Sequence, residues 1–153
     1  MKEIELTQNK VALVDDRDFG FLNQWEWCAF KGRKTFYAYR KVNGVSILMH
    51  RVILDAKTGK EVDHKDRDGL NNQRNNIRLC VHKENQRNRE AQRNSKSGHK
   101  GVSWDKSRNK WTAHIMRKNI GRYLAVGAAI KAYNAAAKEI FGEFAYLNPV
   151  EAK

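Results

Sequence analysis

Hydrophobic and polar residues alternate along the first half of the chain, a pattern that predicts short β-strands. Residues 3–14 alternate twice with a break at Gln8-Asn9, so we expect a hairpin or two short strands there. The aspartates of residues 15–19 are suited to cap a short helical turn. Asn43-Gly44 separates two runs of β-branched and aromatic residues and predicts a second hairpin. We assign the alternating aromatic residues to the core of a small sheet: Trp25, Trp27, Phe30, Phe36, Tyr37 and Tyr39.

The middle of the chain is a polar loop between two short apolar segments. Residues 61–63 and 77–81 are able to form strands, and residues 82–94 are polar and rich in helix formers, which predicts a helix. The loop between the two strands is crowded with Asn and Asp, whose side chains compete for backbone hydrogen bonds and favour fixed turns. We therefore expect a strand–loop–strand–helix unit.

The last third has a different pattern. Residues 94–100 contain Ser, Gly and Lys without an apolar anchor, which indicates a linker. Residues 101–126 contain three short apolar runs separated by polar turns, which predicts a three-stranded antiparallel meander. The Ala-rich residues 128–144 repeat apolar positions at helical spacing up to Gly142 and predict a helix on one face of that sheet. The fold class is therefore α+β.

The charge points to a polyanionic partner. The chain has 30 Lys and Arg against 17 Asp and Glu, a formal charge of +13, and binding to a polyanion would relieve the self-repulsion. No basic amphipathic helix with a broad apolar face is present, so we expect nucleic acid and no membrane. Cys28 and Cys80 have neither zinc-site nor disulfide-framework spacing. With no signal peptide and no run of about 18 apolar residues, we expect a cytoplasmic protein.

Three residues around the polar loop suggest chemistry. Asp63 and His64 stand together at the end of the first strand, and the following helix can present Asn85 toward Asp63. One carboxylate and one amide oxygen are hard ligands that suit Mg²⁺ or Mn²⁺. His64 beside such a metal is able to accept a proton from water at neutral pH. Metal, base and a phosphate ligand together would make a site for phosphodiester hydrolysis.

Two other interpretations of the loop were weighed. The segment HKDRDG imitates the middle of a calcium loop, but His64 would occupy its first position and Asn75 its last, where a bidentate Glu is needed. We reject that interpretation. An Asn/Asp-rich turn without chemistry would explain the turn residues. It would not explain the adjacent Asp63 and His64 together with Asn85.

The segments VDHKDRDGLNNQRNNIRL and HKENQRN resemble the HNH nuclease motif of the phage and homing-endonuclease type, over roughly residues 46–92. The resemblance implies a ββα-metal fold with Asp63 and Asn85 as metal ligands and His64 as general base. It makes Asn76 the asparagine that pins the loop to the strand of His64, although Asn75 is an alternative. It also implies 5′-phosphate and 3′-hydroxyl products, and a host-cell cytoplasmic location if phage-encoded. Arg51, after His50, is a candidate phosphate contact.

Residues 98–148 resemble the AP2 DNA-binding domain through GV-x-W, KW-x-A-x-I, AY-x-AA and GEFA-x-LN. In that family a three-stranded sheet enters the major groove of double-stranded DNA. The segment before the helix is a few residues shorter here. The resemblance and the basic segment before it yield these DNA-binding candidates: Arg87, Arg89, Arg93, Lys100, Ser103, Lys106, Arg108, Lys110, Trp111, His114, Arg117 and Arg122.

We therefore expect an HNH nuclease domain at residues 1–94, a linker at 95–100 and an AP2-like domain at 101–150. The predicted activity is metal-dependent cleavage of DNA, with nicking if the chain acts as a monomer, and no obligate protein partner. The alternative is a DNA-binding regulator that retains the HNH fold without turnover. Convergence of Asp63, His64 and Asn85 on one point would favour the enzyme, and a His64 that faces a packed core would favour the binder.

Overall fold

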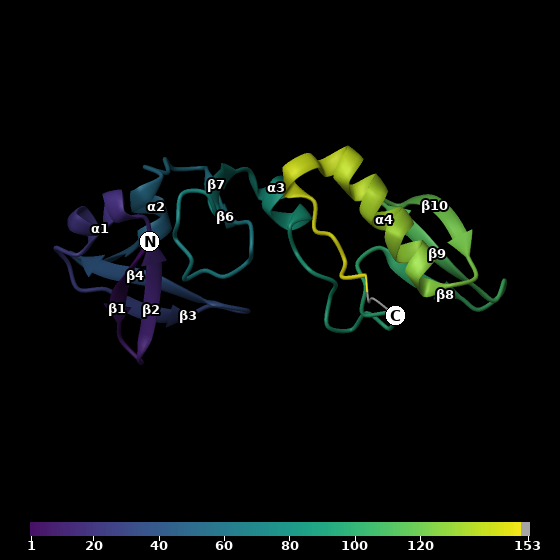
Figure 1. Cartoon of the computed structure of the whole chain (residues 1–153), viewed down its shortest axis with the longest axis horizontal. Helices are drawn as coiled ribbons and strands as arrows, with labels where there is room; N and C mark the ends of the chain where they lie inside the picture. Colours follow the sequence, from purple (N-terminus) through teal and green to yellow (C-terminus); the bar gives the residue numbers. More distant parts are fainter. Residues whose placement is uncertain (151–153) are drawn as a thin grey trace. The chain divides into compact units, whose positions relative to one another are not determined.

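The computed structural model describes residues 1–150 and divides the chain into two compact units, Met1–Asn85 and Gln86–Lys153. Within the described residues the strands form four small sheets, and each strand pair is antiparallel. Figure 1 shows these sheets interspersed with short helices and one longer helix, α4. The α+β class is confirmed. The domain boundaries at residues 94 and 100 stay a prediction.

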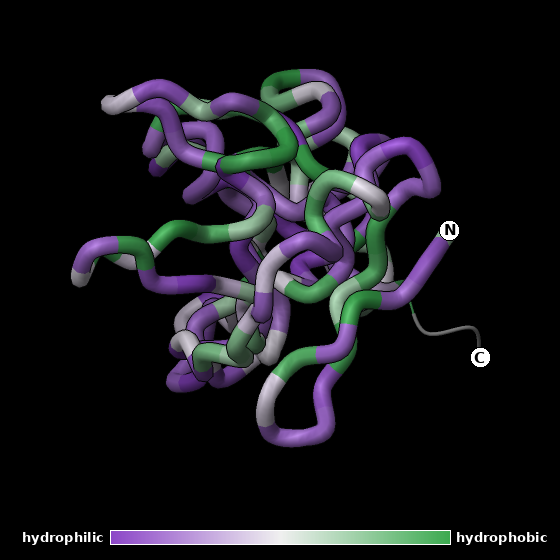
Figure 2. The backbone as a smooth tube through the Cα atoms, turned by 90° about the vertical axis from the view of Figure 1, so that its left-hand side faces the viewer, coloured by the Kyte–Doolittle hydropathy of each residue, from purple (hydrophilic) through white to green (hydrophobic). Residues whose placement is uncertain are grey.

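The N-terminal hairpin forms where the alternation predicts it. β1 (Lys2–Leu6) pairs with β2 (Lys10–Val14), and Gln8 and Asn9 both have positive φ in the turn between them. Figure 2 shows hydrophobic and hydrophilic residues alternating along β1, with hydrophilic residues at the turn. α1 (Asp16–Leu22) follows. The expected aspartate cap of this helix is wrong, because Asp15 makes no capping bond and instead accepts the backbone N–H of Arg74 at 2.9 Å.

A three-stranded sheet follows, in the order β3 (Cys28–Lys31), β4 (Phe36–Val42) and β5 (Val45–Leu48). Asn43 and Gly44 have positive φ between β4 and β5, which confirms the second hairpin. α2 (Met49–Ile53) ends this segment.

The core of the first unit gathers residues from both sheets and the helices: Ile4, Leu6, Ala12, Val14, Leu22, Trp27, Ala29, Ala38, Met49, Ile53 and Ile77. Trp27 is buried and its indole N–H donates to the carbonyl of Leu22 at 2.9 Å. Trp25 and Phe36 pack against this core, as expected. Phe30 does not belong to it, since 52% of the residue is exposed.

β6 (Glu61–His64), β7 (Ile77–Cys80) and α3 (His82–Arg87) form the predicted strand–loop–strand–helix unit. The helix expected over residues 82–94 ends at Arg87. A helix that is polar on all sides buries too little apolar surface to continue.

The second unit is a meander packed on a helix, as the sequence predicts. Its sheet has the order β10 (Lys118–Tyr123), β9 (Lys110–Ile115) and β8 (Val102–Asp105). α4 (Val126–Phe141) covers one face, and the short 3-10 helix η1 (Gly142–Phe144) follows. Tyr133 of α4 lies so close to Gly101 that a side chain at that position would collide with its ring. Gly101 also has φ +70°, so only glycine fits there.

Two further expectations concern the cysteines and the absence of a membrane span. Cys28 and Cys80 are both free thiols, and Cys80 is buried. Burial raises the pKa of the Cys80 thiol to about 11, so it stays protonated. Along residues 1–150, no helix has the length and apolar character that crossing a membrane requires.

Candidate active site

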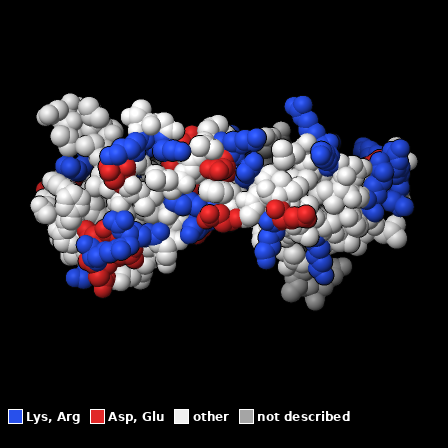
Figure 3. Space-filling model, turned by 90° about the horizontal axis from the view of Figure 1, so that it is seen from above, with Lys and Arg blue, Asp and Glu red and all other residues white. Residues whose placement is uncertain are grey.

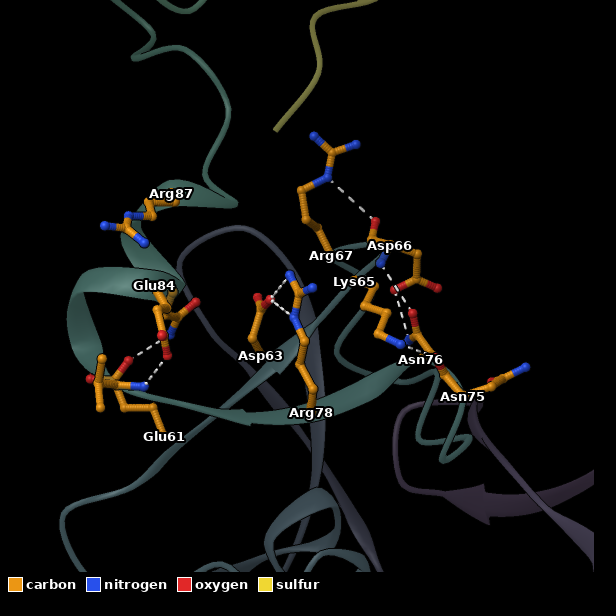
Figure 4. Close-up of polar contacts among 12 residues, drawn as sticks. Glu61, Asp63, Lys65, Asp66, Arg67, Asn75, Asn76, Arg78, Glu84 and Arg87 are labelled. Atoms are coloured by element: carbon orange, nitrogen blue, oxygen red, sulfur yellow. Dashed lines mark hydrogen bonds and ion pairs between the residues drawn. The ribbon is translucent and has the colours of Figure 1, made fainter. Parts of the chain in front are cut away.

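Asp63 and His64 are both buried at the end of β6. Successive residues of a strand point to opposite faces, so the two side chains enter different environments. Asp63 lies directly across the strand pair from Arg78 of β7. Both Nη2 and Nε of Arg78 donate to Oδ2 of Asp63, at 2.6 and 2.9 Å (Figure 4). Both bonds reach the same carboxylate oxygen and fix the orientation of Asp63.

His64 lies among aromatic rings. Its ring centroid is 5.0 Å from that of His50 and 5.9 Å from that of Tyr37. Burial lowers the pKa of His64, opposed by the Asn72 hydrogen bond and by nearby carboxylates. The imidazole is therefore neutral at neutral pH, the form that a general base requires.

Asn72 orients the imidazole of His64. Its Oδ1 lies 3.4 Å from Nε2 of His64, while its Nδ2 donates to the carbonyl of Leu70 at 3.1 Å. The second bond fixes which end of the amide faces the histidine. An oxygen facing Nε2 favours a proton on Nε2, which places the lone pair of the ring on Nδ1.

Asn76 holds the loop after His64 in place. Its Nδ2 donates to Oδ1 of Asp66 and to the carbonyl of Asn71, at 2.9 and 2.8 Å, and its Oδ1 accepts the backbone N–H of Asp66 at 3.1 Å. Its own carbonyl accepts the backbone N–H of Lys65 at 2.9 Å. Asn75 is exposed and contributes its backbone carbonyl to Nζ of Lys65. Of the two alternatives left open by the sequence, this geometry favours Asn76 as the pinning residue.

The N-terminal segment supports the same loop. Leu13 of β2 exchanges backbone hydrogen bonds with Leu70 and Asn72, at 2.9 and 2.8 Å. Arg74 forms two bonds of 2.8 Å with the carboxylate of Asp18. Such paired, charge-assisted bonds fix both distance and orientation. The loop is thus held by residues that precede it by more than fifty positions.

Asn85 of α3 is oriented by Glu61 of β6. Its Nδ2 donates to Oε2 of Glu61 at 2.7 Å, and Nδ1 of His82 lies 2.7 Å from Oε1 of the same carboxylate. Glu84 accepts the backbone N–H of Val81 at 2.9 Å. This bond is the glutamate half of a capping box, and it holds the helix start although no Ser or Thr is present.

The donor set suits a divalent metal in part. Asp63 offers a carboxylate oxygen and Asn85 offers an amide oxygen. The amide nitrogen of Asn85 is directed at Glu61, so the amide oxygen of Asn85 points away from the Glu61 carboxylate. These are hard oxygen ligands. Among residues 1–150, no group of three or more His, Cys, Asp or Glu is arranged to hold a metal ion. A metal here would therefore take its other ligands from amides, water or phosphate, as Mg²⁺ commonly does.

Residues 48–87 match the family described as HNH endonuclease. The chain contains an HNH endonuclease domain. The match spans β6, the loop, β7 and α3, so it covers all four residues that the sequence assigns to catalysis and metal binding. It confirms the HNH resemblance. It ends before residue 98, and the resemblance of residues 98–148 to AP2 stays a prediction.

Two viral proteins are similar to the chain. Protein 3.8 of Escherichia phage T7 is 42% identical over 57 residues, which are 37% of this chain and 47% of that protein. A protein of Acanthamoeba polyphaga mimivirus, named Uncharacterized HNH endonuclease L560, is 29% identical over 109 residues, 67% of this chain and 56% of the other. The chain thus spans about half the length of the curated relatives it matches. No solved structure matches it.

Sequence reasoning missed three residues of the HNH domain. Glu61 orients Asn85, Asn72 orients His64, and Arg78 contacts Asp63. A signal existed for Glu61, because it stands two residues before Asp63 and therefore on the same face of the strand. The contact of Arg78 with Asp63 can be predicted only when the pairing register of β6 and β7 is known.

Two predicted DNA contacts have other partners in the structure. The guanidinium of Arg51 donates to the carbonyls of Ala56, Lys57 and Lys60, at 2.8 to 3.1 Å, so it closes a loop of its own unit. Nζ of Lys100 donates to the carbonyls of Arg87 and Arg89 at 2.6 and 2.7 Å. Carbonyls at a helix end lack partners within the helix. Lys100 thus completes the end of α3. The DNA contacts of Arg51 and Lys100 stay predictions.

The other candidates differ in their placement. Ser103, Thr112 and Arg122 lie side by side in register across the sheet of the second unit. They alternate with Val102 and Ala113 of the core, and so face away from α4. Lys110 and His114 share the strand face of Thr112 and are exposed. Figure 3 shows Lys and Arg side chains gathered over the part of the chain that β8, β9 and β10 form.

Trp111 lies on the opposite face of the sheet, where it packs against the core under α4. The contact of Trp111 with DNA stays a prediction. Of the remaining candidates, Arg89, Arg93, Lys106, Arg108 and Arg117 are exposed. The guanidinium of Arg87, the last residue of α3, stacks 4.8 Å above the ring of Phe141.

Proposed function

We propose that this chain is a metal-dependent DNA endonuclease that hydrolyses phosphodiester bonds, a site-preferring nicking or homing-type enzyme of phage origin. The observation that carries the proposal is the buried Asp63–His64 pair at the end of β6, beside a loop that Asn76 locks through both ends of its amide. An inert turn would not require a buried carboxylate and a buried imidazole at adjacent positions.

His64 is the general base of the proposed reaction. Its imidazole is neutral, and Asn72 favours the proton on Nε2, so Nδ1 accepts the proton of the attacking water. The hydroxide formed attacks phosphorus, and the 3′ oxygen leaves. The products expected from the HNH resemblance are a 5′-phosphate and a 3′-hydroxyl. Asn76 keeps the loop that carries this geometry from moving.

Asp63 and Asn85 would hold the metal, Mg²⁺ or Mn²⁺. When bound, a divalent cation stabilises the extra negative charge of the phosphorane and of the leaving oxygen. Glu61 presents the oxygen of Asn85 by holding its nitrogen. Arg78 keeps the carboxylate of Asp63 in one orientation through Oδ2.

The second unit would place the nuclease on double-stranded DNA. A three-stranded sheet with one polar, basic face is of the size that β-sheet readers insert into the major groove. Ser103, His114 and Arg122 would face the bases, and Lys110 the backbone. The turn residues Lys106, Arg108 and Arg117, with Arg87, Arg89 and Arg93, would contact phosphates. A monomer with one such site cuts one strand per encounter.

A second candidate function is a DNA-binding regulator that retains the HNH fold without turnover. The observation that favours it is the engagement of the expected catalytic groups by the protein itself. Asp63 is ion-paired to Arg78, and His64 lies buried between His50 and Tyr37. A buried ion pair of this kind competes with a metal for the carboxylate.

The test is a supercoiled-plasmid assay at low salt with Mg²⁺ or Mn²⁺, beside His64→Ala and an EDTA control. We expect the wild type to produce open circles and the variant to lose about 10²-fold to 10⁴-fold of the rate, the usual contribution of a general base. Gel shifts measured in parallel should be unchanged. If the wild type shifts the plasmid DNA and cuts it with neither metal, the regulator is the better description.

A further inference from the structure

The turn between β3 and β4 presents two basic residues at its tip. The backbone N–H of Gly32 donates to the carbonyl of Thr35 at 2.9 Å, which closes a tight turn. Arg33 and Lys34 occupy the two central positions, and both are exposed. Side chains at the centre of a two-residue turn project away from the strands that it joins. The turn therefore directs two positive charges outward.

This turn is fastened to the loop that follows His64. Oγ1 of Thr35 accepts the backbone N–H of Gly69 at 3.1 Å and donates to Oδ1 of Asp68 at 3.3 Å. The backbone of Gly69 lies so close to Phe36 and Tyr37 that a Cβ there would collide with both. The turn and the loop thus form one contact surface within the first unit.

The same aromatic ring links the turn to the proposed base. A Cβ at Gly32 would lie 2.7 Å from Cε2 of Tyr37, and the Tyr37 ring lies 5.9 Å from the ring of His64, centroid to centroid. Because protein interiors are close-packed, neighbouring rings have little room to shift relative to one another. A group bound at the turn would therefore be held at a fixed place relative to His64.

The loop adds two more basic residues to this surface. Lys65 and Arg67 are exposed, directly after His64. The carboxylate of Asp66 accepts from the amides of Asn71 and Asn76 at 2.7 and 2.9 Å. Asp68 accepts from Thr35 and from the backbone N–H of Leu70 at 3.0 Å. These bonds shape the loop, while Nζ of Lys65 donates to the carbonyl of Asn75 at 2.8 Å and Nε of Arg67 donates to the carbonyl of Asp66 at 3.4 Å.

We propose that Arg33, Lys34, Lys65 and Arg67, here called the turn surface, hold the DNA backbone beside the bond that is cut. The proposal rests on the proposed nuclease function and adds a DNA contact from the first unit. The occupant is the phosphate backbone of duplex DNA, which carries one negative charge per about 1.7 Å of its axis. The turn surface thereby does two things: it contributes salt-dependent affinity, and it sets the place of the scissile phosphate near His64.

The test compares two double variants that each remove two exposed positive charges from the first unit. Arg33→Gln with Lys34→Gln changes the tip of the turn. Lys41→Gln with Lys57→Gln is the control, since Lys41 lies at the far end of β4 and Nζ of Lys57 pairs with the exposed carboxylate of Asp55. The urea midpoints of both should match the wild type, because exposed substitutions rarely change stability by more than about 0.5 kcal/mol.

The first readout is the salt dependence of binding to a short fluorescent DNA duplex of mixed sequence. Loss of two phosphate contacts should reduce the slope of log K against log salt by about 1.8, whereas the control should keep the wild-type slope. The second readout is plasmid nicking with enzyme in excess over DNA. The turn variant should remain slower than the control even at saturation, because misplacement of a reacting group by about 1 Å costs up to about 10²-fold.

The outcomes separate this inference from the proposed function. If the wild type binds and nicks DNA but the two double variants behave alike, the turn surface is wrong and the nuclease stands. If the turn variant loses slope while the wild type never nicks, the surface holds DNA and the regulator is favoured. If the wild type neither binds nor cuts, both proposals are overturned.

Discussion

The loop at residues 64–76 and the open face of the second unit's sheet are both candidates for contact with DNA, yet their polar side chains are used differently. In the loop, Asn72 and Asn76 are buried and each bonds to defined neighbours. On the sheet, Ser103, His114 and Arg122 are exposed and arranged mainly by strand register. The loop depends on the geometry of each bond, whereas the sheet depends on the sum of its charges and donors.

This difference predicts how each region responds to substitution. A buried polar group that loses its partner costs the full desolvation penalty, about 1–3 kcal/mol. An exposed cation on a DNA-binding face contributes about one phosphate contact, and such contacts combine roughly additively. Substitutions should therefore have large and local effects in the loop, and small and cumulative effects on the sheet.

The largest effect is expected at Asn76. In Asn76→Ala the N–H of Asp66 and the carbonyl of Asn71 lose their partners, and the loop after His64 loosens. Plasmid nicking should fall by about 10²-fold, and the free energy of unfolding by about 1–3 kcal/mol. Asn75→Ala is the matched control and should stay close to wild type in both measurements. The opposite ranking of the two variants would make Asn75 the motif asparagine.

The next largest effect is expected at Glu61. Glu61→Gln puts an amide where a carboxylate now holds the nitrogen of Asn85, so the oxygen of Asn85 is no longer forced outward. Loss of such support for a metal ligand typically weakens metal binding by about 10-fold to 100-fold. Mn²⁺ binding, followed by the electron paramagnetic resonance of the free ion, measures this without any cleavage. Glu3→Gln, at an exposed position of β1, should bind like wild type; equal affinities in both variants would exclude the orienting role.

A moderate effect is expected from acid, through His50. Burial lowers the pKa of His50 from 6.5 to about 3, with repulsion from His64 and Arg51 in the same sense. Between pH 6.5 and about 3, His50 is protonated in the unfolded chain but neutral in the folded protein. The folding free energy that the neutral His50 allows is therefore fully present above pH 6.5 and is lost as the pH falls toward about 3. The loss is at most about 1.4 kcal/mol per pH unit.

Urea unfolding at several pH values measures this slope. His50→Gln should have a shallower fall below pH 6.5 than the wild type. A slope in His50→Gln equal to that of the wild type would show that His50 takes up its proton in the folded state as readily as in the unfolded state.

The smallest effect is expected on the sheet. Lys110→Gln should reduce the slope of log K against log salt by about 1 and weaken binding evenly across DNA sequences, because Lys110 is the residue of this face that we propose to contact the backbone. A loss confined to some sequences would indicate a base contact. Lys131→Gln, exposed on α4, removes the same charge from another element and should leave the slope unchanged. Identical slopes for the two variants would argue against the open face as the DNA surface.

The fold was predictable where local rules decide it. Asn43-Gly44 requires positive φ and produced the expected hairpin, and the alternation around Val102 and Ala113 placed the core face of the second sheet correctly. Local rules failed for charged residues with long side chains. Arg51 and Lys100 look like surface cations in the sequence, but each donates to backbone carbonyls that only the folded chain brings near.

The candidate site was predictable to a similar degree. The adjacency of Asp63 and His64 and the spacing to Asn76 can be read directly, because these residues share one strand and its loop. The contact of Asp63 with Arg78 depends on the strand register, and that of Arg74 with Asp18 joins residues 56 positions apart. Periodicity carries no information about such pairs.

The bonds between Leu13 and the loop have a consequence for modularity. The segment that matches the HNH family, residues 48–87, leaves out β2 and α1, which supply the partners of Leu70, Asn72 and Arg74. Excised alone, it would expose these groups and lose contacts of high sequence separation, which are also the slowest to form during folding. We therefore expect the smallest transplantable unit to begin at the first hairpin. Evolution would have had to move this domain between genes together with its N-terminal hairpin.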